Sequence, residues 1–314
     1  EYASAGPYAH VITKVIAPFG RTNTLAYDST GQLTNVTDVV GLATGFAYDT
    51  TNSLRTLTTP YGDTTFTYWT NANWYALKIA QMGLRTNFYL YLDNDTNSRL
   101  ATNFSAFSPT IDSGLSNTLD TAESQKRNSF HWAPRQFANL SANALTNLMK
   151  DSFADGNVSS NDFLKGRQKH WLRVKHAGAY AGRTLSFQRG PSTDLGGTEQ
   201  GQITWYDYAG KPSGTNWLEG TQILPRLVGW KLPDGSSRYT YSERNSLGRP
   251  TRVIDTWGNS LLRTNWFVYS SDEIDLLIHT NAAGTLAARY GYNGSHQPLA
   301  FTNAVDELTT FTYD

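Results

Sequence analysis

The clearest arrangement of potential metal ligands lies between positions 151 and 162. Asp151, Asp155 and Asp162 fall at the first, fifth and twelfth positions of a loop, and Asn157 lies between them. Oxygen ligands at this spacing, with a glycine at the sixth position, are typical of a calcium loop. The third position lacks an oxygen ligand, and the last aspartate is shorter than the usual bidentate glutamate. A polar connector between two helices explains the same residues, so the sequence predicts no cofactor and leaves weak calcium binding as the alternative.

The chain carries few of the residues that nucleophilic or metal-assisted catalysis needs. It has no cysteine, which excludes thiolate nucleophiles, thiolate metal sites and disulfides. His170 and His176 are the closest pair of histidines, and their spacing fits neither one helix face nor a zinc site. Glycosidase chemistry needs two carboxylates about 5–10 Å apart in space, which a sequence does not reveal. The sequence therefore predicts a non-catalytic protein, with a hydrolase whose site lies in residues 101–200 as the less favoured alternative.

Aromatic side chains are better suited to binding than to reaction. The chain has nine Trp and 18 Tyr residues, and sugar rings can stack on the apolar faces of such side chains. Several tryptophans, among them Trp69, Trp205 and Trp230, fall near turns or strand ends, where exposure is expected. The same residues could instead line the core of a sheet. Glycans are therefore one candidate class of partner.

Charge and hydropathy argue against two other classes of partner. The 26 basic and 26 acidic residues give a formal net charge of zero, and like charges form no runs. A neutral chain is a poor candidate for broad electrostatic capture of nucleic acid or anionic lipid. No apolar stretch approaches the roughly 18–20 residues that span a bilayer. The sequence thus predicts neither a nucleic-acid partner nor a membrane span.

One short unit recurs and organises the chain. It consists of an apolar residue, any residue, and a tyrosine followed by a turn-former. The tyrosines recur at steps of 21 and 20 residues near the N-terminus, and of 28, 23 and 21 residues near the C-terminus. Such a period is typical of a repeat architecture. The residues that define the repeat are Tyr27, Asp28, Gly31, Tyr48, Asp49, Tyr68, Tyr241, Gly248, Tyr269, Tyr292, Tyr313 and Asp314.

Each copy predicts a strand, a turn, a second strand and a second turn. Side chains two positions apart lie on one face of a strand, so Phe46 and Tyr48 should share a face. The stretch from Asp28 to Gly31 has the residues that a type I turn prefers at its first and fourth positions. The aspartate can also accept a backbone N–H two residues on. Strands of roughly 5–6 residues, joined by such turns, account for the length of the repeat.

Stacked units predict a mainly β fold, because a two-stranded unit cannot bury its aromatic face alone. We expect a coiled sheet or β-solenoid shell of strand-turn-strand repeats in residues 1–100 and 201–314. An antiparallel sandwich and a propeller with two units per blade are the alternatives. Unpaired strands at both ends would bind other chains. We therefore expect the chain alone to oligomerise or to be poorly soluble.

Residues 101–200 do not follow the repeat and predict an irregular insertion with short helices. Residues 141–150 predict one helix, with Ser141 as its N-cap and Leu145, Leu148 and Met149 on one apolar stripe. Residues 163–172 predict a second helix, because large side chains recur every four positions. The insertion would pack on the shell or plug it.

The repeat resembles the YD repeat of RHS proteins. Two stretches carry the resemblance: residues 26–38, with Tyr27-Asp28-Ser-Thr-Gly31-Gln-Leu, and residues 245–255, with Gly248-Arg-Pro before Asp255. The resemblance covers about residues 10–100 and 201–314. The sequence departs from the family in residues 101–200. It also lacks the Asp-Pro-x-Gly-Leu motif, which marks the self-cleaving plug of toxin shells, and it ends in mid-repeat.

The resemblance implies an architectural function. RHS proteins are large, and their repeats wind into a hollow β-shell. In bacterial toxin systems the shell encloses a C-terminal toxic domain, and other relatives form surface or adhesive assemblies. The chain is accordingly expected to be a structural shell segment of a large secreted or cell-surface protein, which encloses or presents a cargo. Its partner would be the rest of the parent polypeptide. A surface adhesin or carbohydrate-binding repeat array is the alternative.

Overall fold

The computed structural model describes residues 1–3, 9–71, 74–83, 85–92, 104–149, 160–174, 181–212, 214–257 and 261–313. Within these ranges the chain forms 20 strands and a few short helices, so the expectation of a mainly β fold is confirmed. The N-terminal elements are β1 (Lys14–Ile16), the 3-10 turn η1 (Pro18–Gly20), β2 (Thr22–Tyr27), β3 (Leu33–Thr37), β4 (Ala43–Tyr48), β5 (Leu54–Thr59), β6 (Gly62–Thr70), β7 (Trp74–Gln81) and β8 (Arg85–Leu92).

The middle of the chain contains both helices and strands, in contrast to the strands on either side. Its elements are η2 (Phe104–Phe107), β9 (Asn128–Trp132), α1 (Pro134–Ala138), α2 (Ala144–Leu148), α3 (Ser160–Lys165), β10 (Arg167–Arg173) and β11 (Ala181–Arg189). The remaining strands are β12 (Ile203–Asp207), β13 (Leu227–Lys231), β14 (Ser237–Arg244), β15 (Pro250–Trp257), β16 (Leu261–Tyr269), β17 (Leu276–Thr280), β18 (Leu286–Tyr292), β19 (Pro298–Asn303) and β20 (Leu308–Thr310).

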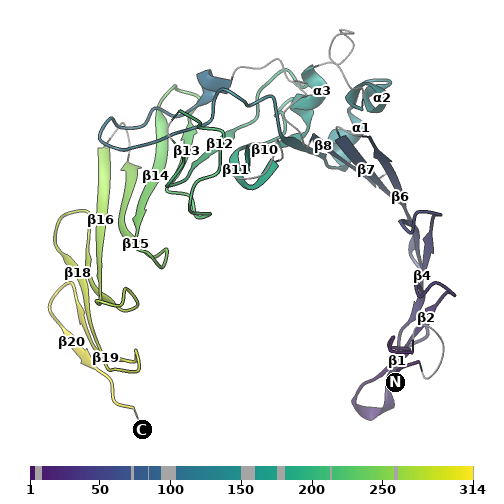
Figure 1. Cartoon of the computed structure of the whole chain (residues 1–314), viewed down its shortest axis with the longest axis horizontal. Helices are drawn as coiled ribbons and strands as arrows, with labels where there is room; N and C mark the ends of the chain where they lie inside the picture. The colour runs from purple at the N-terminus through teal and green to yellow at the C-terminus, as the bar shows by residue number, and fades with distance from the viewer. Residues whose placement is uncertain are drawn as a thin grey trace.

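Each strand pairs antiparallel with the next strand in the chain, so one open sheet runs from β1 to β20. The sheet bends into an arch, with the two termini at its two feet (Figure 1). This is a coiled sheet, as expected, rather than the two sheets of a sandwich or the blades of a propeller. Among the described residues, β1 and β20 each pair on one side only.

Turns and bulges give the repeat its shape. Asp28 Oδ1 accepts the backbone N–H of Thr30 at 2.8 Å and that of Gln32 at 3.0 Å, and Gly31 takes a φ of 82°, which glycine adopts at low cost. The register shifts by one residue at Tyr27, Tyr48, Tyr269 and Tyr292. Because a bulge increases local twist and bends the strand, the tyrosine of each of these copies marks a place where the sheet curves.

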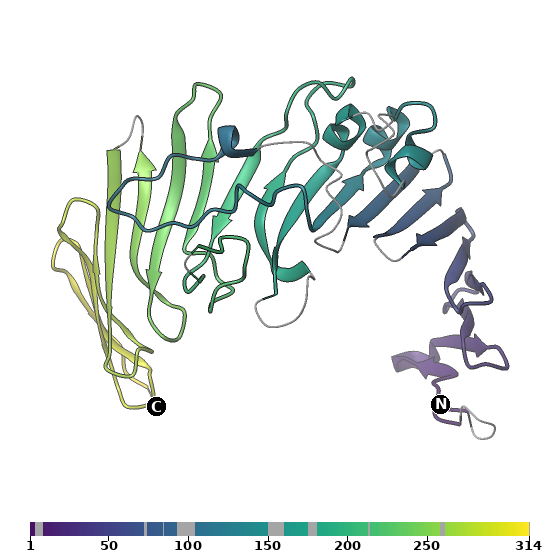
Figure 2. The same cartoon turned by 45° about the horizontal axis from the view of Figure 1, so that its top comes forward.

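The two faces of the arch are covered differently. A long segment, residues 104–127 (the strap), crosses the convex face together with α1, α2 and α3 (Figure 2). We call this covered side the outer face and the opposite, concave side the inner face. The strap is anchored by Trp205, whose indole N–H donates to the Phe107 carbonyl oxygen at 2.9 Å. It also passes so close to β13 that a Cβ at Gly229 would lie 3.0 Å from Pro109 Cγ.

Two apolar cores lie between the sheet and these covering elements. One core joins Phe88, Phe130 and Trp132 of the sheet to Leu148 of α2 and Phe163 of α3. The second packs Leu115 and Leu119 of the strap on sheet residues that include Phe187, Trp205, Leu227 and Tyr241. Complete burial of one such large side chain contributes about 1.5–3 kcal/mol. The strap and helices therefore hold the top of the arch.

In the N-terminal arm of the arch the apolar side chains lie on the inner face instead. Cross-strand pairing joins Leu25 to Val36, and Phe46 to Leu57. Pairing through β6 and β7 places this row on the face opposite Ala76, which is buried in the outer core. The side chains of the row are half-buried rather than buried. The apolar face of the sheet thus changes sides between the N-terminal arm and the top of the arch.

The middle segment corrects two expectations about helices. The first helix spans only Ala144–Leu148, with Asn143 as its N-cap at a φ of 62°. Ser141 cannot cap it because its hydroxyl donates to the Asp162 carboxylate. The second predicted helix ends at Lys165, and residues 167–173 form β10 between β9 and β11. A helix of seven residues would leave most of its backbone N–H and C=O groups without a partner inside the helix. As β10, the segment pairs with a strand on each side, and this tertiary context overrides the local preference.

Candidate functional site

The proposed calcium loop lies almost wholly outside the described residues. This applies to Asp151, Asp155 and Asn157, while Asp162 is described and nearly buried. The Asp162 carboxylate accepts the backbone N–H of Ser141 at 3.2 Å and the ammonium of Lys165 at 3.0 Å. These contacts give Asp162 a structural role, in which it ties the start of α2 to α3. Calcium binding stays a prediction.

The tyrosines of the repeat make a recurring long-range hydrogen bond. The hydroxyls of Tyr27, Tyr48 and Tyr313 donate to carbonyl oxygens 15 residues earlier, at 2.9, 3.0 and 2.8 Å. Each bond ties one unit to the preceding one. Tyr68 and Tyr269 lie under arginine side chains, those of Arg55 at 5.8 Å and Arg249 at 6.0 Å. These are favourable cation–π contacts.

The other residues of the repeat have simple roles or different positions. Asp49 holds its turn through Thr51 and Ser53, and these hydrogen bonds lower its pKa to about 2. Gly248 takes a φ of 81°. Tyr241 lies on the outer face, buried under the strap. Tyr292 lies in β18, two positions after Tyr290, whose side chain is on the inner face. Asp314 is outside the described residues.

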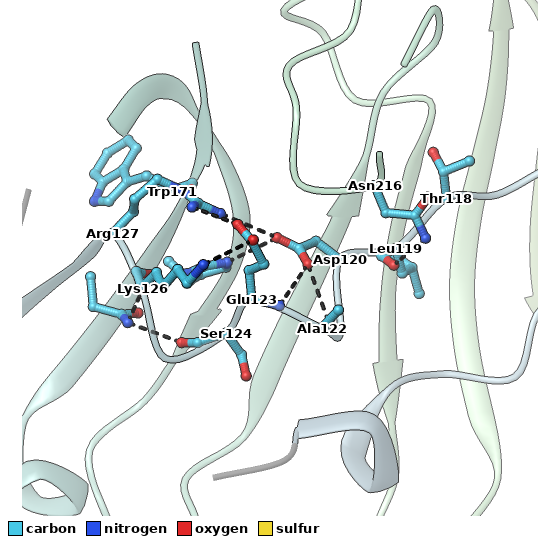
Figure 3. A network of polar contacts seen from close by, with 12 residues as sticks. Thr118, Leu119, Asp120, Ala122, Glu123, Ser124, Lys126, Arg127, Trp171 and Asn216 are labelled. Carbon is cyan, nitrogen blue, oxygen red and sulfur yellow. Dashed lines mark hydrogen bonds and ion pairs between the residues drawn. The ribbon is translucent and has the colours of Figure 1, made fainter. Parts of the chain in front are cut away.

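A buried polar network fastens the strap to β10, and no motif of the sequence indicates it (Figure 3). Asp120, Arg127 and His170 are fully buried. Asp120 Oδ2 lies 3.2 Å from His170 Nε2 and 3.7 Å from an Arg127 guanidinium nitrogen. Arg127 also pairs with Glu123 at 2.7 Å and donates to the Trp171 carbonyl oxygen at 3.1 Å. Buried charges are stable only when paired in this way.

A second set of charges fastens the strap to β12. Asp207, fully buried, accepts the backbone N–H and the hydroxyl of Thr118 at 3.0 and 2.8 Å. It also pairs with Arg226 at 2.8 Å and with Lys211 at 3.3 Å. Thr118 and Asp207 are 89 residues apart in the chain. A single sequence carries no pattern that reveals such a pairing.

The network is arranged for structure rather than for chemistry. Burial lowers the pKa of His170 and outweighs the raising effect of Asp120, so the imidazole is neutral near pH 7. Burial raises the pKa of Asp120, but its hydrogen bond with His170 and the positive charge of Arg127 have the larger effect, so the pKa stays below 3.8. Both side chains are sealed under the strap, where no substrate reaches them. The prediction of a non-catalytic chain is unaffected by this pair.

One group of potential ligands, two of them exposed and one half-buried, was not anticipated from the sequence. Asp272, Asp275 and His296 place a ligand atom each within 4.8 Å of one another. His296 Nδ1 lies 2.9 Å from Asp275 Oδ2, and this contact raises the pKa of the imidazole. Asp272 accepts the backbone N–H of Ile274. The internal hydrogen bonds explain the group as a linked pair of turns.

The inner face at the top of the arch presents aromatic, hydroxyl, amide and basic groups. Tyr75 and Tyr91 stack at 4.3 Å between ring centroids. With Trp171 and Arg183 they line a pocket of about 380 Å³. A continuous row crosses eight strands in register, made of Tyr75, Tyr91, Ser129, Lys169, Gln188, Thr204, Trp230 and Arg238.

A second inner-face pocket lies over β13 to β17 and has a volume of about 520 Å³. Trp230, Arg238, Asp255, Arg263 and Asn265 are among its lining residues. Trp230 is fixed by its indole N–H, which donates to Thr204 at 2.9 Å. These two pockets make the inner face the candidate functional surface. The described residues include no helix that is long and apolar enough to cross a membrane.

Comparisons with known proteins give distant structural likenesses only. No protein-family model and no curated protein matches the chain. The TcdB2-TccC3-TEV structure is similar over 97% of this chain and 16% of its own, at 12% identity and a TM-score of 0.31. The structure of TcdB2-TccC3 without its hypervariable C-terminal region is similar over 90% of this chain and 17% of its own, at 10% identity and a TM-score of 0.18. A porin-like protein from Bacteroides vulgatus is similar over 83% of this chain and 99% of its own, at 14% identity and a TM-score of 0.21. The chain thus spans about a sixth of the TcdB2-TccC3 chains.

Proposed function

We propose that the chain is a non-catalytic segment of a β-repeat shell, whose inner face encloses or presents another part of a longer secreted or cell-surface protein. The observation that carries the proposal is the unequal covering of the two faces. The outer face at the top of the arch is sealed by the strap and three helices. None of the described helices and no part of the strap covers the inner face.

The composition of the inner face supports an occupant. In the N-terminal arm, Phe46, Leu57 and Phe66 form part of an apolar row that stays half-buried. Extended apolar surface that stays open to water is typical of a binding surface. At the top, the row from Tyr75 to Arg238 adds hydrogen-bonding and basic groups. A covering polypeptide would bury the first surface and pair with the second.

Cysteine labelling tests the proposal, and residues 1–314 contribute no cysteine that would react. Arg238→Cys places a thiol on the inner face, and Arg135→Cys places one on α1 at the outer face. Both arginines are exposed in the chain alone, which makes them a matched pair. Each variant is labelled with a maleimide reagent in the isolated chain and in the longer protein, and the mass change is followed with time.

The expected result is a loss of labelling at one position only. In the longer protein the thiol at 238 should react much more slowly than in the isolated chain, while the thiol at 135 reacts equally fast in both. Denaturation should restore labelling at 238. Equal rates at 238 in the isolated chain and the longer protein would show an uncovered inner face, and the shell proposal would fail.

A carbohydrate-binding array is the second candidate function. It is favoured by the pocket at Tyr75, Tyr91 and Trp171, because stacked and flat aromatic rings suit sugar rings. A glycan array probed with the chain and with Trp171→Ala tests it. Hits that are lost in the variant would support this function, and signals at background for both proteins would remove it.

A further inference from the structure

Charge is distributed unevenly along the sheet. The chain as a whole has a formal net charge of zero. The five neighbouring strands β7 to β11 nevertheless contain seven Arg or Lys residues and no Asp or Glu. A basic side chain of these strands therefore has no acidic neighbour within them.

Two of these basic residues, Arg167 and Lys169, lie on the inner face of β10. Their neighbours in β10, Gln168 and His170, are fully buried on the outer face, and side chains alternate along a strand. Cross-strand pairing places Arg167 opposite His131 of β9. Arg167, Lys169 and His131 thus form one group on the inner face, which we call the inner basic cluster.

The two charges of this cluster are not neutralised within the chain. Arg167 is exposed, and Lys169 is half-buried with its ammonium 5.9 Å from the centre of the Trp171 ring. Neither residue forms an ion pair or a side-chain hydrogen bond with any residue that the structure describes. Asp120 of the strap is on the opposite face of the sheet, where it contacts Arg127. Both positive charges are therefore open to a ligand on the inner face.

His131 is held in one orientation beside these charges. Its ring stacks on that of Tyr89 in β8, with 4.4 Å between the ring centroids. Its Nε2 lies 3.1 Å from Asn87 Oδ1. An amide oxygen only accepts hydrogen bonds, so Nε2 carries the proton of the neutral ring and Nδ1 is an acceptor. Protonation of His131 would turn Nδ1 into a second donor.

The titratable side chains that face His131 from the neighbouring strands are Tyr89 of β8 and Arg167 and Lys169 of β10. Burial lowers the pKa of His131, and the positive charges of Arg167 and Lys169 lower it further, so the ring is neutral near pH 7. A carboxylate bound beside the ring would favour its protonated form. An acidic ligand and a proton at His131 should therefore bind together.

The spacing of the cluster suits an acidic polypeptide. A guanidinium group can donate two parallel hydrogen bonds to one carboxylate, and an ammonium group is a compact positive charge. Arg167 and Lys169 are two positions apart, which is about 6.6 Å along a strand. Every second side chain of an extended peptide lies on one face at the same spacing. Such a peptide, with Asp or Glu at alternate positions, would present one carboxylate to each basic residue.

We infer that Arg167, Lys169 and His131 bind an acidic stretch of the polypeptide that the inner face covers. The inference rests on the proposed shell function, which supplies a polypeptide at this face. Its ligand is an extended segment with Asp or Glu at alternate positions. An acidic oligosaccharide has the same charge but belongs to the second candidate function, and the test separates the two.

The test is fluorescence anisotropy on the chain 1–314 at low salt. The probe is a short labelled peptide in which Glu alternates with Ala, and its counterpart has Gln in place of Glu. Arg167→Gln and Lys169→Gln remove one charge each from the inner basic cluster, and Arg135→Gln removes one from the outer face as the matched control. Thermal unfolding of each variant, at each pH used, confirms that it remains folded.

The Glu peptide should bind, and its Gln counterpart should not. Each cluster variant should weaken binding of the Glu peptide about fivefold, the upper end for one partly exposed ion pair, and Arg135→Gln should leave it unchanged. Added salt should weaken binding in the wild type. Equal binding of the two peptides, or equal effects of Lys169→Gln and Arg135→Gln, would overturn the inference.

A pH series tests the role of His131. Between about pH 7.5 and about pH 5.5 the Glu side chains of the probe stay ionised, because their pKa is about 4.3. The wild-type chain should bind the Glu peptide more tightly at the lower pH, and His131→Gln should lose most of this increase. An equal increase in the two proteins would remove His131 from the site and overturn the inference as stated.

Two further outcomes separate this inference from its neighbours. Tighter binding of an oligogalacturonate than of the Glu peptide, with the same dependence on Lys169, would overturn the choice of a peptide ligand. Slow labelling at 238 in the longer protein, without peptide binding by the chain, would leave the shell function standing and refute the acidic ligand. Fast labelling at 238 refutes the shell function itself.

Discussion

His170 Nε2 lies 3.2 Å from Asp120 Oδ2, and both side chains are fully buried between the strap and β10. The two residues are 50 positions apart in the chain. Their contact joins a covering segment to the sheet that it covers. It is therefore the natural place to test what holds the arch together.

Asp120→Ala should destabilise the chain by about 3–5 kcal/mol, because removing one partner leaves buried charge and polar groups unpaired. The groups left behind are His170 Nε2 and part of the Arg127 guanidinium. Chemical denaturation followed by tryptophan fluorescence measures the change. Asp63→Ala, at an exposed position of β6, serves as the control and should change the free energy of unfolding by no more than about 0.5 kcal/mol. Equal effects would mean that the network does not anchor the strap.

The stability of the chain should fall as pH drops below 6.5, in part because of His170. Burial lowers the pKa of this imidazole below its ordinary 6.5 in the folded chain. The unfolded chain then binds more protons below pH 6.5, so the free energy of unfolding decreases as pH falls. His296 acts in the opposite sense, because its raised pKa gives stability that is lost as pH rises.

Denaturation curves between pH 6.5 and about pH 5, above the pH at which carboxyl groups titrate, measure this effect. All the proteins compared carry His296→Gln, which removes the opposite effect of that residue. The decrease should be smaller when His170→Gln is added to His296→Gln. The same slope in the two proteins would show that His170 does not stay neutral in the folded chain.

Tyr48→Phe should cost about 0.5–1.5 kcal/mol, the usual net contribution of one hydrogen bond. The substitution removes the hydroxyl that donates to the Leu33 carbonyl oxygen at 3.0 Å and keeps the ring. Tyr61→Phe is the matched control, since Tyr61 is 81% exposed, and should be neutral. Thermal unfolding of the two variants compares them. A neutral Tyr48→Phe would mean that the ring alone ties the units together.

The carboxyl of Asp49 should titrate near pH 2 in the folded chain. The hydroxyl of Thr51 and the backbone N–H of Ser53 donate to it and lower its pKa from 3.8 to about 2. The stability that these bonds give is present above pH 3.8 and is lost as pH falls through about 2. Carbon-13 NMR of the carboxyl measures the pKa directly. In Thr51→Val, which removes the hydroxyl donor, the pKa of Asp49 should rise toward 3.8, and an unchanged pKa would contradict the turn chemistry.

The sequence determined the local structure of the repeats. Alternation placed Phe46 and Tyr48 on one face, and the turn residues from Asp28 to Gly31 form the hydrogen bonds that their types favour. These features depend on residues within a few positions of one another. For the same reason the sequence predicted a mainly β, coiled sheet.

Only the tertiary structure decided the rest. Residues 167–173 suit a helix by spacing, but pairing with β9 and β11 makes them a strand. The contacts of Asp120 with His170, and of Thr118 with Asp207, join residues 50 and 89 positions apart. Which face of the sheet is covered depends on where the strap folds back, and that is set by burial summed over many distant residues. A periodic pattern specifies neighbours along a strand, whereas it does not specify which distant segment will pack on its face.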